Sequence, residues 1–262
     1  MPHVDLDRFR LHYEVEGPGD ASALVLSHSI GANLSMWDFV APALATRYKV
    51  VRYDTRGHGS SGTPSGPYSI ADLGRDAVAL LDALNIDRCC FCGLSLGGMI
   101  GLWLGIHTPQ RVERLILANT AARIGTLELW NERIRQVREG GLASMTDAIL
   151  ARWFTPQFRQ HSPAIMESVG RMLASTSSEG YAACCAAIRD EDLSTSLHSI
   201  AAPALVITGA EDPATPPRDG QFLAERIPHA KLVELATSHL SAIEYPAGFS
   251  SAVLDFLGGQ EG

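Results

Sequence analysis

Residues 88–107, RCCFCGLSLGGMIGLWLGIH, decide the fold of this chain of 262 residues. Arg88 to Leu94 is an apolar run typical of a buried strand, and Leu96 to His107 has the composition of a helix. Between them, residues 93–97 form the pattern GxSxG. A chain that passes directly from a strand into a helix holds the central serine in a strained conformation, and the glycines let neighbouring chains come close. The stretch therefore predicts a sharp turn that presents the hydroxyl of Ser95.

Strand-like and helix-like segments alternate on both sides of this turn. The further strands are expected at Ala23 to His28, Lys49 to Asp54, Arg114 to Ala121, Ala204 to Asp212 and Ala230 to His239. Helices are expected at Met36 to Arg47, Ser69 to Leu84, Pro217 to Ile227 and Ser241 to Leu257. Arg8 to Gly17 alternates like an antiparallel edge strand. The pattern predicts an α/β fold, in which a mostly parallel sheet is flanked by helices.

The alternation is interrupted between residues 123 and 197. This stretch contains segments with helical periodicity, such as WNERIRQVREGGLASMTDAILARWF and MESVGRMLAS, and no convincing strand. We therefore expect a core formed by residues 1–122 and 198–262, with an inserted helical cap at 123–197.

Charge and composition limit the possible partners. The formal net charge is −8, and the chain has no run of Lys or Arg, so we expect neither nucleic acid nor an anionic membrane as a partner. The N-terminus is polar and acidic, and the longest nearly apolar run, Leu94 to Ile106, is shorter than the ~20 residues that span a bilayer. These features predict a soluble protein that is not exported.

The five cysteines are better explained as buried thiols than as metal ligands. Cys89, Cys90 and Cys92 lie on one strand-like run, where neighbouring side chains point to opposite faces and disulfide geometry is poor. A zinc site instead uses CxxC pairs on turns together with further ligands. The cysteines therefore fit a reducing cytoplasm, and we expect no metal.

A serine hydroxyl needs a neighbouring base, and that base needs an acid to orient it. With this type of turn, the order along the chain is Ser, Asp or Glu, His. His239 follows the last strand and reaches the active edge of the sheet, whereas His229 precedes that strand. The acid is Asp212 or Glu211, and the Asp-Pro turn favours Asp212. The remaining late histidines, His107, His161 and His198, fit surface positions.

Two loops from earlier strands reach the same edge. An oxyanion hole would use the backbone N–H of Leu96 together with that of Ile30, in the loop that follows the strand ending at His28. The other loop, residues 54–61, precedes the nucleophile, so we expect it to be structural, with Asp54 and Arg56 pairing to brace it.

The assembled motifs resemble the α/β-hydrolase family from end to end. They are HxxG at 28–31, DxRGxGxS at 54–61, GxSxGG at 93–98 and GxxDPxxP at 209–216. Within that family the chain looks most similar to 3-oxoadipate enol-lactonases, on the stretches HSIGANLSMWD, GLSLGGMIGLWLG, LILANTAARIG, WNERI and RWFTP. The resemblance implies hydrolysis of a small carboxylate-bearing lactone through an acyl-enzyme, without a cofactor. We expect the protein to be a cytoplasmic monomer or homodimer.

The substrate carboxylate needs a positive partner in the cap. Arg133, Arg135, Arg138 and Arg152 are available there, beside Trp130 and Trp153. We expect Arg133 next to Trp130 to bind the carboxylate, with Trp153 in the pocket wall. Alternatively, these arginines lie on solvent-exposed helix faces and the two tryptophans belong to the hydrophobic core.

Two residues depart from the family pattern. Ser29 stands where many relatives have Gly, and Leu96 where Met is frequent, but neither change removes a backbone donor. The Ser29 hydroxyl could add a donor near the oxyanion or the substrate, or it could face solvent.

Other functions use the same motifs. A carboxylesterase or a C–C bond hydrolase would use the same three residues with a differently lined cap. A ligand receptor of this fold would show little turnover.

Overall fold

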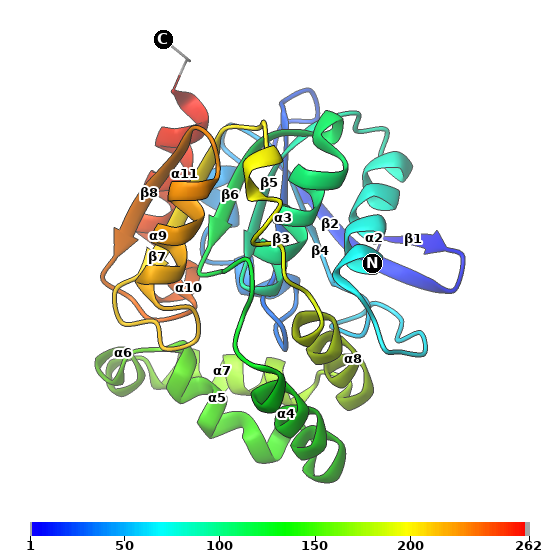
Figure 1. The fold of residues 1–262 in the computed structure, drawn as a ribbon, viewed down its shortest axis with the longest axis vertical. Coiled ribbons are helices and arrows are strands. Elements are labelled where there is room, and N and C mark those ends of the chain that lie inside the picture. The colour runs from blue at the N-terminus through cyan, green and yellow to red at the C-terminus, as the bar shows by residue number, and fades with distance from the viewer. Residues whose placement is uncertain (1, 260–262) are drawn as a thin grey trace.

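A twisted, mostly parallel sheet forms the centre of the molecule (Figure 1). The computed structural model describes residues 2–259, and within them the sheet has eight strands in the order β1-β2-β4-β3-β5-β6-β7-β8. Among the described strands, β2 is antiparallel to both β1 and β4, and all other pairings are parallel. The strands are β1 (His3–Leu6), β2 (Phe9–Glu16), β3 (Ala23–Ser27), β4 (Lys49–Tyr53), β5 (Cys89–Leu94), β6 (Val112–Ala118), β7 (Ala204–Gly209) and β8 (Ala230–Leu235). The expected fold class is confirmed.

Helices cover the sheet and form a separate group at one end of it (Figure 1). The flanking α-helices are α1 (Ala41–Leu44), α2 (Ile70–Ala83), α3 (Leu96–His107), α9 (Pro217–Arg226), α10 (Ser241–Glu244) and α11 (Pro246–Gly258). The group at the lower end of the view consists of α4 (Leu127–Gly140), α5 (Thr146–Trp153), α6 (Pro156–His161), α7 (Pro163–Ala174) and α8 (Ser178–Arg189). Short 3-10 helices are η1 (Leu34–Trp37), η2 (Pro109–Arg111), η3 (Leu142–Met145) and η4 (Leu197–Ser199). All described regular structure between β6 and β7 is helical, whereas the cap boundaries at 123 and 197 stay predictions.

Three expected elements differ from the structure. The expected edge strand, β2, lies inside the sheet, because β1 pairs with it on the outer side. The expected helix at Met36 to Arg47 is instead η1 followed by the short α1, and Pro42 stands in the first turn of α1, where its missing N–H is tolerated. The expected last helix is divided into α10 and α11 by Pro246, because the residue before a proline disfavours helical geometry.

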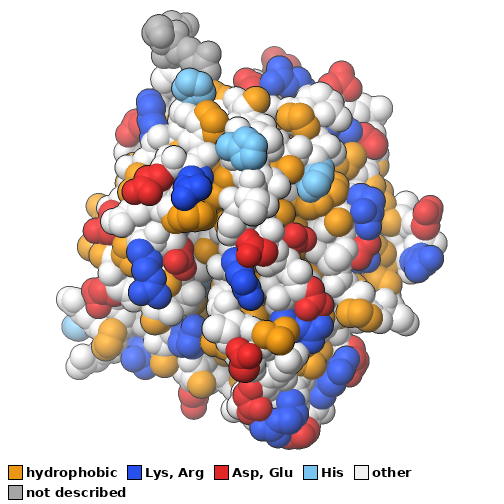
Figure 2. Space-filling view, viewed as in Figure 1, with side chains coloured by type: hydrophobic (Ala, Val, Ile, Leu, Met, Phe, Trp, Pro, Cys, Tyr) orange, Lys and Arg blue, Asp and Glu red, His pale blue; other side chains and the backbone are white. Residues whose placement is uncertain are grey.

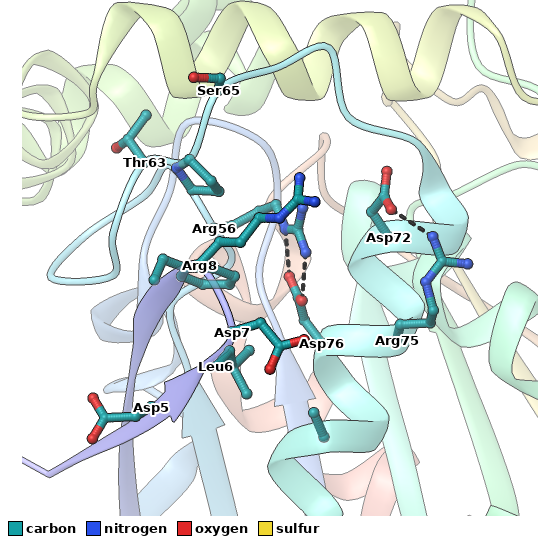
Figure 3. A pocket seen from close by; sticks show the side chains of 13 residues that line it. Asp5, Leu6, Asp7, Arg8, Arg56, Thr63, Ser65, Asp72, Arg75 and Asp76 are labelled. Atoms are coloured by element: carbon teal, nitrogen blue, oxygen red, sulfur yellow. Dashed lines mark hydrogen bonds and ion pairs between the residues drawn. The ribbon is translucent and has the colours of Figure 1, made fainter.

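The sequence-predicted pairing of Asp54 with Arg56 is wrong. Arg56 instead donates from Nε and Nη2 to the two carboxylate oxygens of Asp76 on α2, at 2.5 and 2.6 Å (Figure 3). Its guanidinium also lies over the rings of Phe9 and Tyr68. The planar guanidinium matches a carboxylate in two places at once, and Asp76 on α2 is placed to use both. The loop at residues 54–61 is thus fixed to α2, which is the structural role expected for it, but Arg56 pairs with Asp76 and not with Asp54.

Asp54 is used to hold backbone together. It accepts hydrogen bonds from the N–H groups of Leu34 and Ser60, at 2.7 and 2.8 Å, and lies 2.8 Å from Nδ1 of His12. The carboxylate is almost fully buried. It therefore fixes the loop that follows β4 to the segment that follows β3.

The described cysteines are buried free thiols, as expected from the sequence. They are Cys89, Cys90 and Cys92 on β5, and Cys184 and Cys185 on α8. Burial raises the pKa of Cys89 to about 12, so the thiol stays protonated.

On the face seen in Figure 2, cationic and anionic side chains are interspersed. No helix among residues 2–259 is both long and apolar enough to cross a membrane.

The Arg56–Asp76 pair leads to a prediction about stability. In Asp76→Ala, the partly buried guanidinium loses its only described ion-pair partner, so we expect the free energy of unfolding to fall by about 3 kcal/mol. Urea denaturation followed by circular dichroism measures this. Glu132→Ala, which breaks an exposed pair with Arg135, serves as the control and should cost under about 1 kcal/mol. Equal losses in the two variants would contradict the structural role of the buried pair.

Candidate active site

Ser95 occupies the sharp turn between β5 and α3. Its backbone has φ 58° and ψ −112°, which is the strained geometry expected for a central serine in this turn. The glycines on either side are needed for space: a Cβ on Gly93 would lie 2.0 Å from the carbonyl oxygen of Gly97, and a Cβ on Gly97 would lie 2.0 Å from that of Ser27. Any larger residue would force β3, β5 and α3 apart, so the pattern GxSxG is required by packing.

Ser95 opens onto a cavity of about 410 Å³ between the sheet and the helices α4 and α5. Several residues expected from the sequence share this cavity: Ser95, His239, Ile30, Trp130, Arg133 and Trp153. Asp212, Leu96 and Ser29 are not among its lining residues. A larger cleft of about 840 Å³ lies over α2 and the β1–β2 turn (Figure 3), but it contains none of the residues expected to react.

Asp212 and His239 are hydrogen-bonded to each other, with 2.8 Å between Oδ2 of Asp212 and Nδ1 of His239. They follow β7 and β8, so the parallel strands bring them to the edge where β5 ends at Ser95. Both residues are buried. Glu211, the alternative acid, is exposed, as are His107, His161, His198 and His229.

Asn119 and Thr215 complete the surroundings of Asp212 and were not expected from the sequence. Asn119 Nδ2 and Thr215 Oγ1 both donate to Oδ2 of Asp212, at 3.0 and 2.8 Å. The N–H groups of Ala214 and Thr215 donate to the other oxygen, Oδ1. Asn119 follows β6 at the active edge of the sheet, and Thr215 lies within the GxxDPxxP pattern. Both positions could therefore have been predicted from the sequence to lie near Asp212.

The loop carrying Ile30 is held by two neutral histidines. Nε2 of His58 accepts from the N–H of Gly31, and Nε2 of His28 accepts from that of Thr55, both at 2.9 Å. Burial lowers the pKa of His58 to about 3 and lowers that of His28 as well, so both rings remain neutral and can accept. Ile30 therefore has a fixed position on the wall of the cavity.

Ser29 is fully buried, so the alternative of a solvent-facing serine is wrong. Its hydroxyl has no hydrogen-bond partner among residues 2–259. Leu96 is the first residue of α3, where a backbone N–H has no acceptor within its own helix. Contributions of Ser29, Ile30 and Leu96 to an oxyanion hole stay predictions.

The structure separates the four cap arginines. Arg133 and Arg152 line the cavity, whereas Arg135 is paired with Glu132 and Glu139 on the surface. Arg138 is likewise exposed and paired with Glu179. Trp130 and Trp153 are buried, and the guanidinium of Arg133 lies 5.4 Å from the centre of the Trp130 ring.

Arg133 and Arg152 give the cavity a local positive charge. Neither forms an ion pair with an Asp or Glu among residues 2–259. The pKa of Arg152 is lowered by burial and, to a smaller extent, by the neighbouring charge of Arg133. Two unpaired cations held close together favour an anion between them.

Comparison with known proteins identifies the family. A family model described as alpha/beta hydrolase fold matches residues 22–246, which is most of the chain. The chain belongs to this family. The hydrolase is 48% identical over 243 residues to 3-oxoadipate enol-lactonase 2 of Acinetobacter baylyi, covering 93% of this chain and 91% of that protein. It is also 39% identical to 3-oxoadipate enol-lactonase 1 of the same organism, covering 91% and 90% of the two chains.

A solved structure agrees with these relatives. The hydrolase superimposes on the crystal structure of the enol-lactonase from Burkholderia xenovorans with a TM-score of 0.97. The two sequences are 43% identical, and the match covers 98% of this chain and 100% of that one. The similarity therefore extends over the sheet and the helices α4 to α8 alike.

The environment of Asp212 in the hydrolase favours the carboxylate. Burial alone would raise the pKa of Asp212, but the positive charge of His239 and the donated hydrogen bonds outweigh it and lower the pKa to about 2. An unfolded aspartate has a pKa near 3.9, so the ionised form stabilises the folded state above about pH 4. That contribution is lost as the pH falls through about 2.

Thr215→Val tests this environment. The variant loses the hydroxyl that donates to Oδ2, so we expect the pKa of Asp212 to rise and the acid-induced loss of stability to begin at higher pH. Urea denaturation between about pH 6 and pH 2 measures the shift. Thr237→Val is a matched control, because Thr237 is also buried but its hydroxyl has no partner among the described residues. The same pH profile in Thr215→Val and the control would refute this explanation.

Proposed function

We propose that this hydrolase is a 3-oxoadipate enol-lactonase that uses Ser95 as nucleophile, His239 as base and Asp212 as the acid that orients the base. The observation that carries the proposal is one cavity in which Ser95 and the Asp212-bound His239 face two unpaired arginines. The identity to the Acinetobacter enol-lactonases supports the substrate. A lactone that carries a carboxylate supplies both an ester for the serine and an anion for the arginines.

In the first half of the reaction, the Ser95 oxygen attacks the lactone carbonyl while His239 takes the hydroxyl proton. The N–H groups of Ile30 and Leu96 stabilise the oxyanion. The bond between the carbonyl carbon and the ring oxygen then breaks, and the enol oxygen leaves with its electron pair. His239 protonates this leaving group, and conversion of the enol to a ketone removes the nucleophile that could close the ring again.

In the second half, His239 takes a proton from water, and the resulting hydroxide attacks the acyl carbon. The bond to Ser95 breaks, and His239 returns the proton to the serine oxygen. The product is a second carboxylate, so 3-oxoadipate leaves as a dianion. Asp212 stays ionised throughout, because it stabilises the imidazolium without taking its proton. The reaction needs no cofactor.

We propose that the helices α4 to α8 form the cap over this site. Arg133 binds the substrate carboxylate, and the ring of Trp130 holds the guanidinium of Arg133 in place. Arg152 lies on the same cavity wall and adds a second positive charge near the carboxylate. Trp153 and Ile149 supply the apolar wall for the ring and its methylene groups.

The first test is turnover of the enol-lactone itself. The purified protein should remove the ultraviolet absorbance of 3-oxoadipate enol-lactone, Ser95→Ala should show no turnover, and His239→Ala should lose about 10²- to 10⁴-fold in kcat. A neutral aryl acetate is assayed in parallel. Preference for the aryl ester would instead favour a general esterase, a single burst without turnover would favour a receptor, and near-normal rates in either variant would refute the assigned roles.

Arg133→Ala tests how the carboxylate is recognised. Loss of a charge-assisted hydrogen bond of about 1.5 to 3 kcal/mol should reduce kcat/KM for the lactone by about 10- to 100-fold, chiefly through KM. Turnover of the neutral aryl acetate should stay close to that of the unaltered protein. Arg135→Ala is the matched control, since this cap arginine is already paired on the surface. If the two variants gave the same lactone kinetics, Arg133 would have no part in binding the carboxylate.

A further inference from the structure

Glu244, at the end of α10, connects the loop that carries His239 to the helical segment that carries Arg152 and Trp153. One carboxylate oxygen, Oε2, accepts from the N–H of Ser238 at 2.8 Å. The other, Oε1, accepts from both the N–H and the hydroxyl of Thr155, at 3.1 and 2.5 Å. Glu244 and Thr155 are 89 residues apart in the sequence, so a single side chain joins two distant segments.

Further hydrogen bonds lie on either side of this bridge. The hydroxyl of Ser238 donates to the carbonyl oxygen of Arg152 at 3.1 Å, and the N–H of Leu240 donates to that of Trp153 at 3.0 Å. The end of α5 is thus attached to the residues immediately before and after His239. Arg152 and Trp153 line the cavity. The residues that would bind the substrate are therefore attached through hydrogen bonds to the loop that carries His239, the proposed base.

The bridge depends on a carboxylate that is bound by neutral donors. Glu244 is partly buried and forms no ion pair with a Lys, Arg or His of residues 2–259, so its negative charge is held only by neutral donors. A carboxylate offers what a neutral side chain does not: two oxygens that both accept, without a donor hydrogen on either side.

We propose that Glu244 is a positioning residue for the reaction, which sets the place of His239 relative to the substrate-binding residues at the end of α5. The inference rests on the proposed function. Glu244 does not touch the cavity; it acts through Ser238 on the base and through Thr155 on the neighbouring Arg152 and Trp153. If the bridge is lost, the imidazole of His239 shifts relative to Arg152 and Trp153 at the end of α5.

The test uses Glu244→Gln, which keeps the size of the side chain. An amide accepts through one oxygen only, and its NH₂ group must face a donor N–H on one side of the bridge. Misplacement of a catalytic group by about 1 Å can cost about 10²-fold, so we expect kcat to fall by about 10- to 100-fold. The fall should appear with both the enol-lactone and the neutral aryl acetate, because both need His239. KM should rise for the lactone only, because only the lactone uses Arg152.

Glu234→Gln is the matched control, because Glu234 is an exposed glutamate on β8 in the same part of the chain. Thermal unfolding and near-ultraviolet circular dichroism establish that each variant is folded, and kcat is expressed per folded enzyme. A folded Glu244→Gln with kcat within about two-fold of the unaltered protein on both substrates, whatever its melting temperature, overturns the proposal. If the unaltered protein does not hydrolyse the enol-lactone, the proposed substrate fails, but the aryl acetate still tests whether Glu244 acts on the base.

Discussion

The left-handed backbone of Ser95 is the constraint on which the rest of the site depends. Ser95 keeps a backbone φ of 58° because β3, β5 and α3 pack closely around the turn. The packing is so close that neither Gly93 nor Gly97 has space for a side chain. That packing fixes the end of β5 relative to its neighbours in the sheet. Since the strands are parallel here, their carboxyl ends collect the loops that follow β3, β6, β7 and β8 at the same edge. The same sheet that holds Ser95 in its strained conformation thus also places Asp212 and His239 at this edge.

Buried charge is handled in three different ways around this edge. Asp76 is neutralised by the guanidinium of Arg56, which ties a loop to a helix. Asp212 lies against His239 and accepts additional hydrogen bonds that keep its pKa near 2. Glu244 has neutral donors only. The first arrangement fixes a loop to a helix. The second gives a carboxylate that remains ionised beside an imidazole, and the third links the loop that carries His239 to the segment that follows α5. In all three arrangements the carboxylate fixes the position of its hydrogen-bond donors.

The sequence predicted the fold and the proposed reacting residues because these obey local rules. Ser95 has a motif of its own, and His239 and Asp212 follow apolar strands at the correct end. Other contacts had no local signal: Thr155 and Glu244 meet across 89 residues, and helical periodicity could not tell that Arg152 faces the cavity while Arg138 faces solvent. The expected Asp54–Arg56 pair failed for a related reason, since proximity in sequence says nothing about a better placed carboxylate on α2. Pro246 did carry a readable signal for the break between α10 and α11.

The two arginines explain why a pocket of this size would discriminate between esters. Burial and the neighbouring charge of Arg133 both disfavour the charged form of Arg152, and a bound carboxylate would relieve this unfavourable interaction. A neutral ester leaves that repulsion in place, whereas a lactone with a carboxylate removes it on binding. In the proposed reaction, hydrolysis would create a second carboxylate at Ser95, on the side of the cavity where His239 is hydrogen-bonded to the negatively charged Asp212, and this charge would repel it. In the proposed reaction, Arg133 and Arg152 would therefore draw the monoanionic substrate into the cavity, and the opposite charge of Asp212 would oppose retention of the new carboxylate beside the proposed nucleophile.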